Sequence, residues 1–280
     1  SNVPNVEPLS ALNPFVELHE RENVSRKGFR GVNDDRTFSV DKRSFESSMI
    51  GKMAISSVNN KNVGITRQLT ADPKIESVRG YTSTKGVDGD FNDLQLASFS
   101  ELMTPGTVSR DDAIRTAIAT SQTGHIVQTE NAQPALISNG VDEIVPAYLT
   151  DEFSVMAQQD GTVIDINKEY MIVQYKDKSK QAVPLAHRYS FNTGSGFYVD
   201  NQLITSLKVN DKFKQNDILA YHSKFFTKGS DGVVRMNIGP IAKVAFMETY
   251  DTYEDAGMVI SKFSKQMSTR ITMRQTAKVD

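Results

Sequence analysis

Short apolar runs separated by polar turns fill the chain from about residue 136 onward, and they limit the folds that it can adopt. Residues 162–167 and 170–175 are two such runs around an Asn-Lys-Glu turn, a pattern typical of a β-hairpin. Residues 202–220 alternate further short runs with polar turns. Many short strands with such turns are typical of a barrel, so we predict an α+β fold that is mainly β.

The stretch Pro240–Ser261, PIAKVAFMETYDTYEDAGMVIS, changes from apolar to acidic and aromatic and back to apolar. This order predicts a strand, a loop and a second strand, with the carboxylates of the loop at the rim of a sheet. Because hard divalent cations take oxygen ligands, the adjacent Glu254 and Asp255 could face a metal or a metal-bound phosphate. The alternative is a solvated pair of surface acids.

The clearest predicted helix follows Ser109, a residue type that favours the N-cap, and Asp112 gives it a pattern close to a capping box. Its apolar residues recur at helical spacing: Ala113, Ile114, Ala117 and Ile118. Arg115 lies off that stripe. The end of the helix, which includes Ser121 and His125, is small and polar. Such an end either approaches a nucleic-acid backbone closely or is ordinary surface.

Basic residues gather near the start of the chain, where residues 13–70 hold ten Lys or Arg against seven Asp or Glu. Arg26, Lys27 and Arg30 cluster on a stretch that two glycines mark as a loop. Arginine and lysine side chains on such a loop could grip phosphates. The alternative is a solvated loop.

Three further segments carry weaker signals. Residues 49–66 place two short apolar runs around a polar loop, which predicts a strand, a loop, and a short strand or turn. Residues 71–108 are rich in loop-forming residues, and we expect at most a short strand or helix there. Residues 262–278 carry five Lys or Arg and no acid, so they either contact nucleic acid or a partner or extend the last strand into solvent.

The composition excludes some classes of site. None of the 280 residues is Cys, so disulfides and thiolate metal sites are excluded. The net charge of −2 gives no global sign of nucleic-acid binding, so such a role would depend on local patches. No apolar run approaches the length of a membrane span. The chain begins Ser-Asn without Met, so we expect a processed product or a fragment.

Six motifs follow one another along the chain: ALNPFVELHERENVSRKGFRG, IGKMAISSVNNKNVGIT, SRDDAIRTAIATSQTGHIV, HRYSFNTGSGFYVDNQ, SLKVNDKFKQNDILAYHS and VAFMETYDTYEDAGMVIS. In this order they resemble the middle of the β subunit of multisubunit DNA-directed RNA polymerase. Where that family has Glu-Thr-Pro-Glu-Gly, this chain has residues 56–60, Ser-Ser-Val-Asn-Asn. Where the family has Asn-Met-Gln-Arg-Gln, it has residues 121–125, Ser-Gln-Thr-Gly-His. Divergence on this scale looks like a bacteriophage polymerase whose β subunit is split.

The resemblance implies a domain organisation, with an RNA polymerase β-like fork region and an incomplete double-psi β-barrel. The segments are an arm (1–12), the fork-like region (13–75), a connector (76–108), a helix and hybrid-proximal segment (109–135), the hybrid-binding barrel segment (136–261) and a basic tail (262–280). In the family, later sequence closes the barrel. We therefore expect exposed apolar strand edges and obligate partners.

The resemblance also implies a role for each matched residue. Glu254 and Asp255 would lie near the second Mg²⁺, which arrives with the nucleoside triphosphate, and Arg115 would contact the triphosphate. The remaining matches imply nucleic-acid contacts: Arg26, Lys27 and Arg30 in the fork loop, Lys52 and Asn62 in the loop lining the main channel, and Ser121 and His125 beside the RNA–DNA hybrid.

The implied reaction is nucleotidyl transfer with two Mg²⁺ ions. This chain lacks the Asn-Ala-Asp-Phe-Asp-Gly-Asp motif that holds the catalytic Mg²⁺ in the family's β′ subunit, so we expect it to be inactive alone. The expected partners are a β′-like subunit, other β fragments, the DNA template, the RNA transcript and nucleoside triphosphates, but no membrane. The expected location is the host bacterial cytoplasm or the virion.

Two other functions fit the same sequence. A β-rich structural protein of a phage tail or baseplate would share the short strands and the lack of Cys. A stand-alone nucleic-acid-binding barrel would need an affinity that falls steeply with salt, and the near-neutral net charge argues against it.

Overall fold

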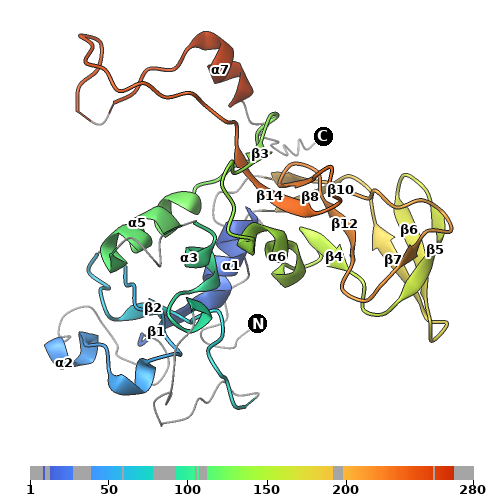
Figure 1. Ribbon diagram of the computed structural model, residues 1–280, viewed down its shortest axis with the longest axis horizontal. Coiled ribbons are helices and arrows are strands. Elements are labelled where there is room, and N and C mark those ends of the chain that lie inside the picture. The colour runs from blue at the N-terminus through green and yellow to red at the C-terminus, as the bar shows by residue number, and fades with distance from the viewer. Residues whose placement is uncertain are drawn as a thin grey trace, which may run out of the picture. The chain divides into compact units, whose positions relative to one another are not determined.

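The computed structural model describes residues 9, 13–27, 39–58, 60–77, 93–104, 106, 112–191, 198–254 and 256–267. The chain divides into two compact units (Figure 1): unit 1 is Ser1–Ser10 with Phe15–His125, and unit 2 is Ala11–Pro14 with Ile126–Asp280. The described residues have an α+β fold with more strand than helix, which confirms the predicted class. Their sheets are open.

Unit 1 is organised around a helix that runs directly into a strand. Helix α1 (Pro14–Glu22) leads into β1 (Asn23–Ser25), which pairs antiparallel with β2 (Thr66–Gln68). An isolated bridge between Met53 and Leu69 follows the same direction. The core consists of buried apolar side chains from segments far apart in the sequence: Phe15, Leu18, Ala54, Ile65, Ala97, Phe99 and Leu102.

Four other described helical elements of unit 1 are short: α2 (Val40–Arg43), η1 (Ser47–Met49), η2 (Asp93–Gln95) and α3 (Phe99–Leu102). Helix α5 (Ala113–Thr123), with 11 residues, is longer than α1. Residues 49–66 therefore begin in a 3-10 turn rather than in the predicted strand. Among the described residues of this stretch, only the bridge and the start of β2 are strand-like. The backbone N–H of Ile65 donates to Asn62 O, so the polar loop is closed by a tight turn before β2.

Helix α5 differs from its prediction in two ways. Its N-cap is Asp112, whose side chain accepts a hydrogen bond from the Arg115 N–H at 2.8 Å, whereas Ser109 lies outside the described residues. Its buried side chains are Thr116 and Thr120, whereas Ile114 and Ile118 of the expected apolar stripe are exposed and Ala113 and Ala117 are half-buried. The Thr120 hydroxyl donates to Thr116 O at 2.8 Å, so this polar face satisfies its own hydrogen bonds and can be buried.

The predicted hairpin of unit 2 is confirmed. Strands β5 (Gly161–Ile166) and β6 (Tyr170–Tyr175) pair antiparallel, and the Asn167 side chain accepts hydrogen bonds from two backbone N–H groups in the turn. With β7 (Lys180–Pro184) and β11 (Lys212–Phe213) they form a four-stranded sheet in the order β11-β5-β6-β7. Val163, Met171, Val173 and Val183 are fully buried in the core of this sheet.

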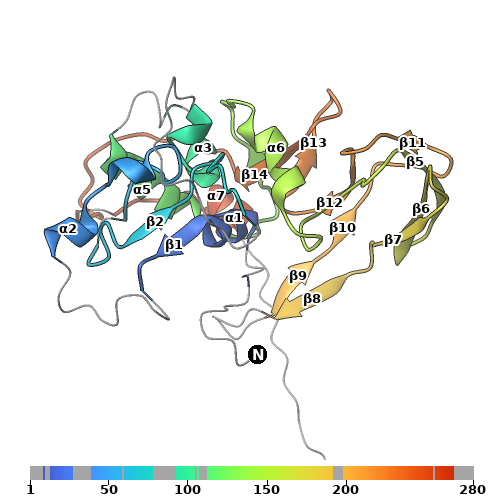
Figure 2. The ribbon, with the colours of Figure 1, turned by 90° about the horizontal axis from the view of Figure 1, so that it is seen from below.

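Three smaller antiparallel sheets complete the described strands of unit 2. One contains β10 (Leu203–Ile204), β12 (Ile218–His222) and β4 (Ser154–Met156); the second contains β13 (Phe226–Lys228), β14 (Val234–Gly239) and β3 (Gln133–Pro134); the third contains β8 (Arg188–Phe191) and β9 (Tyr198–Asn201). Figure 2 shows β8 and β9 as a separate hairpin. The predicted alternation of short strands and turns over residues 202–220 is thus confirmed.

A turn motif repeats within that alternation. In each copy a Lys, two residues and an Asp close a turn: Lys208 with Asp211, and Lys214 with Asp217. Each Asp carboxylate accepts a hydrogen bond from the Lys backbone N–H, at 2.8 and 2.7 Å, and each Asp N–H donates to the Lys carbonyl. The residue before each Asp is Asn with a positive φ, a conformation that Asn tolerates.

The prediction of β structure from about residue 136 is wrong for residues 141–148, which form α6 (Val141–Tyr148). Gly140, with φ +87°, changes the chain direction before the helix, and two acids lie in the first turn, where the helix dipole favours them. Helix α6 packs against β14 and β4 and buries Val145 and Pro146. The internal Pro obscured the helical pattern in the sequence.

The strand–loop–strand prediction for residues 240–261 is also wrong. The described residues between 241 and 260 form no strand, and most of their side chains are exposed. A strand is stabilised by hydrogen bonds to a neighbouring strand, and β14 ends before this segment begins. Helix α7 (Ser261–Gln266) follows it (Figure 1), so the basic tail does not begin as an extension of a strand. Residues 268–280 lie outside the description.

Candidate functional site

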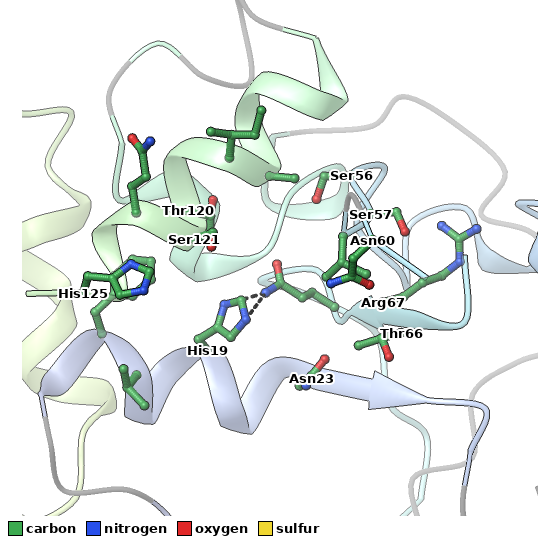
Figure 3. Close-up of a pocket in the computed structure, with 18 residues that line it drawn as sticks. His19, Asn23, Ser56, Ser57, Asn60, Thr66, Arg67, Thr120, Ser121 and His125 are labelled. Carbon is green, nitrogen blue, oxygen red and sulfur yellow. Dashed lines mark hydrogen bonds between the residues drawn. The ribbon is translucent and has the colours of Figure 1, made fainter. Parts of the chain in front are cut away.

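A pocket of about 590 Å³ lies within unit 1, between three segments that are far apart in the sequence. Helix α1 forms one wall, the residues from Ser56 through β2 form the second, and α5 forms the third (Figure 3). In Figure 3, α5 carries Ser121, His125 lies just beyond the end of α5, and α1 carries His19, while Asn60 and Arg67 lie on the side away from His125.

The walls of the pocket carry hydrogen-bond donors and basic groups. The described residues that line it include hydroxyls, amides, two histidines and one arginine, but no Asp or Glu. Apolar contacts come from Phe15, Val16, Val58, Ala117 and Ile118. A surface of this kind suits a polar anion such as a phosphate group, because donors are plentiful and nearby carboxylates are not.

Arg67 is the buried cation of this pocket, with 8% of the residue exposed. Its Nη2 donates to the Arg43 carbonyl at 2.9 Å, and its guanidinium carbon lies 5.1 Å from the centroid of the Phe45 ring. Among the described residues, its Nε has no hydrogen-bond partner and no carboxylate pairs with it. Burial, and then the charge of Arg26, lowers the pKa of Arg67. An anion at the pocket would relieve this imbalance.

His19 lies at the centre of Figure 3 and is held from two sides. Its ring stacks on Phe15 with centroids 6.3 Å apart, and the Gln68 Nε2 lies 2.6 Å from its Nδ1. Burial lowers the pKa of His19, which outweighs the opposing effect of Glu20. A neutral His19 can accept a hydrogen bond from the Gln68 amide, so the ring is oriented by it.

A buried polar network continues from Gln68 to α3. The Ser98 hydroxyl donates to Gln68 Oε1 at 3.0 Å, and the Ser100 hydroxyl donates to the Glu22 carboxylate at 2.6 Å. Burial raises the pKa of Glu22, and it raises the pKa of Glu101 to about 7. The network joins the end of α1, β2 and the start of α3, so it fixes the wall of the pocket that carries His19.

Two of the residues predicted to contact nucleic acid lie at this pocket. Ser121 and His125, expected beside the RNA–DNA hybrid, both line it and are exposed. Arg115, expected at the triphosphate, is an exposed residue of the same helix and is not among the lining residues.

The predicted basic loop is only partly described. The Lys27 Nζ donates to Asn62 Oδ1 at 2.8 Å, so two residues expected at the fork and the channel loop are in contact. Arg26 pairs with Glu46 at 2.8 Å. Lys52 is buried, with 4% exposed, which argues against an open channel-lining side chain in this chain alone. Arg30 lies outside the described residues.

Of the predicted acidic pair, Glu254 is an exposed residue of unit 2 with φ +51°, and Asp255 lies outside the described residues. Within the described part of the chain, no group of three His, Asp or Glu side chains is arranged to hold a metal ion. In the same part, no helix has both the length and the apolar character needed to cross a bilayer.

Sequence reasoning missed His19, Arg67, Gln68, Glu22 and the buried Glu101. One signal was available for His19, because it lies four residues after Phe15 and so on the same face of a helix. The pocket position of Arg67 depends on the pairing of β2 with β1, which local sequence does not reveal. No protein-family model matches this chain, and no curated protein matches it, so these comparisons assign it to no family.

Proposed function

We propose that this chain is a component of a bacteriophage multisubunit DNA-directed RNA polymerase, a split part of its β side. One observation carries the proposal. The resemblance assigns residues 11–31, 50–66 and 109–127 to the fork, the channel loop and the hybrid-facing helix, and the pocket of unit 1 is lined by residues from all three. Collinear motifs that converge on one site are expected of a shared functional surface.

The chemistry of the pocket supports the same proposal. A nucleic-acid backbone presents phosphates, which arginine and hydroxyl or amide donors bind well. Arg67 supplies a buried positive charge, and Ser121 and His125 are accessible at its edge. In this proposal the pocket and its rim contact the RNA–DNA hybrid, and the fork residues Arg26, Lys27 and Arg30 face the downstream edge of the open DNA.

The proposed catalytic contribution is on the side of the nucleoside triphosphate. Arg115 contacts the triphosphate, and Glu254 and Asp255 act near the second Mg²⁺. The principal Mg²⁺ is held by a β′-like partner, and the two ions together support nucleotidyl transfer. The open sheets of unit 2 are consistent with a barrel that another polypeptide completes. We place the protein in the host bacterial cytoplasm or packaged in the virion.

The experiment is reconstitution of the polymerase with and without this chain. RNA extension on a preassembled RNA–DNA scaffold, with the β′-like subunit and the other β fragments present, is expected to require it. Elongation at full rate in its absence would contradict the proposal. This chain alone is expected to give no extension with any metal.

The second candidate is a structural protein of the virion, which the exposed apolar segment after β14 also favours, because assembly proteins carry surfaces that only their neighbours cover. That candidate predicts many copies per particle and no affinity for a β′-like chain. Quantitative mass spectrometry of purified particles, together with a binding assay against the β′-like chain, distinguishes the two.

A further inference from the structure

The segment 241–260 carries the largest set of exposed apolar side chains in the described part of the chain. Below it is called the arm; it is a different segment from the arm expected over residues 1–12. Figure 1 shows the segment 241–260 leaving β14 and leading to α7. Eight of its nine large apolar residues are more than half exposed: Val244, Phe246, Met247, Tyr250, Tyr253, Met258, Val259 and Ile260. The ninth, Ile241, is half-buried. Phe246 is 100% exposed, so its ring packs on no other residue that the structure describes.

The backbone of the arm is as open as its side chains. Within residues 241–254 and 256–260, the internal contacts are few and local: Ala256 N donates to Glu254 O, Asp251 N donates to the Thr249 hydroxyl, and that hydroxyl lies 3.5 Å from Met258 Sδ. The contact between Thr249 and Met258 brings the end of the first apolar limb, residues 241–247, close to the second apolar limb, residues 258–260. No described residue of 241–247 pairs with a strand.

The exposed area is too large for ordinary surface. Because an aromatic side chain presents about 150–250 Å², the three aromatic residues alone expose about 450 Å² or more, as much as the largest apolar patch of a typical monomer. The five aliphatic residues bring the arm near the roughly 800 Å² that one partner buries in a specific interface. The arm therefore has the size of an interface.

Both faces of the first limb are apolar and exposed. In an extended chain successive side chains point to opposite sides, so Phe246 and Met247 face different directions. A nearly continuous apolar run of this kind is typical of a strand that is buried on both faces. A two-fold symmetric pair of identical arms would cover one face of each and leave the other open.

We propose that the arm is a docking element that a second, non-identical protein encloses on both faces, adding a strand to residues 241–247. Main-chain hydrogen bonds from the partner would satisfy the open backbone, and apolar pockets would receive side chains on each face. The partner's surface is apolar with an exposed strand edge. The proposal rests on the proposed function only for the partner's identity, as another polymerase chain.

Hydrogen–deuterium exchange on the full chain, free and in the complex purified from the cells that naturally make it, tests the proposal. The amides of residues 241–247 are expected to exchange at unprotected rates in the free chain and at least about a hundredfold more slowly in the complex. Phe246→Ser and Met247→Ser are each expected to weaken partner binding at least about tenfold. The matched control is Val40→Ser, which removes an 82%-exposed apolar residue of α2 and should leave affinity unchanged.

Each result decides between outcomes. Unprotected amides in a complex that elongates RNA would overturn the arm proposal and leave the proposed function standing. Protected amides in a complex without a metal-holding polymerase chain would support the arm proposal and contradict the proposed function. Reversible dimerisation of the purified chain that Phe246→Ser abolishes, with no protection by another protein, would mean that a second copy occupies the arm. Loss of folding is excluded by an unchanged thermal transition of both variants.

Discussion

The Ser98 hydroxyl accepts a hydrogen bond from the Glu101 backbone N–H at 3.2 Å, while the Glu101 carboxylate accepts one from the Ser98 N–H at 2.8 Å. This capping box begins α3 in the core of unit 1, where Glu101 is 1% exposed. Burial, with a contribution from the charge of Glu22, raises the pKa of Glu101 to about 7. The box therefore combines a helix cap with a carboxyl that resists ionisation.

The stability of unit 1 is expected to fall as the pH rises. Because Glu101 binds its proton more tightly in the folded chain than in the unfolded one, its contribution is fully present below pH about 4.5 and is lost as the pH rises through about 7. A shift of this size corresponds to about 3 kcal/mol. Urea unfolding at pH 5 and pH 8 measures the difference, and Glu101→Gln, which keeps an acceptor for Ser98, should reduce it. An equal pH response in that variant would contradict the prediction.

Replacing Arg67 with Met is expected to change binding and stability in different directions. The variant removes a buried cation without a described carboxylate partner, so the free energy of unfolding should stay the same or rise. Binding of an RNA–DNA hybrid by the assembled complex should weaken, and the dependence of log affinity on log salt should decrease by about one phosphate contact. Fluorescence anisotropy at several salt concentrations measures both.

The matched control for Arg67 is Arg235→Gln in unit 2. Arg235 is paired with Glu143 and Asp231 and is not among the residues that line the pocket, so its loss removes the same charge without changing the pocket lining. Its salt dependence should equal that of the unchanged chain. An equal loss of affinity in both variants would mean that net charge, and not the pocket, determines binding.

Local sequence predicted those parts of the fold whose stabilising contacts are local. The hairpin of β5 and β6 depends on a turn in which Asn167 binds its own neighbours, and the turns closed by Asp211 and Asp217 follow the same rule. Helix α6 was missed because its stability depends on packing against β14, and Pro146 hides its pattern.

Residues 241–247 and the buried face of α5 were predicted wrongly for a related reason. Residues 241–247 have the composition of a buried strand, but a strand exists only where a neighbour pairs with it, and the described residues supply none. For α5, sequence periodicity selected Ile114 and Ile118 as buried, whereas the structure buries Thr116 and Thr120. The convergence of α1, β2 and α5 on one pocket is a tertiary fact, and only the order of the motifs hinted at it.

Unit 2 is expected to be sensitive to substitution at Gly161, the first residue of β5. A Cβ atom there would lie 2.5 Å from Gln174 O and 2.6 Å from the Phe213 ring, and the backbone atom cannot move without disturbing the sheet. Gly161→Ala should lower the free energy of unfolding by about 1–3 kcal/mol. Gly257→Ala, where nothing lies within 4 Å, is the control and should change it by less than about 0.5 kcal/mol. Urea unfolding followed by circular dichroism would contradict the prediction if both variants behaved alike.

Arg115→Ala is expected to slow nucleotide addition in the reconstituted polymerase, most strongly at low triphosphate concentration. The side chain is exposed, and no carboxylate among the described residues forms an ion pair with it. A contact between its guanidinium group and a phosphate would therefore form without breaking an existing ion pair. KM for the triphosphate should therefore rise more than kcat falls.

Glu254→Ala combined with Asp255→Ala should reduce the rate of nucleotide addition and increase the Mg²⁺ concentration that gives half of the maximal rate. Glu248→Ala, at a neighbouring acid of the arm, should change neither quantity. Rapid-quench measurement of single-nucleotide addition tests these roles. If all variants added nucleotide as fast as the unchanged enzyme at limiting triphosphate, the assignment of these residues would be wrong.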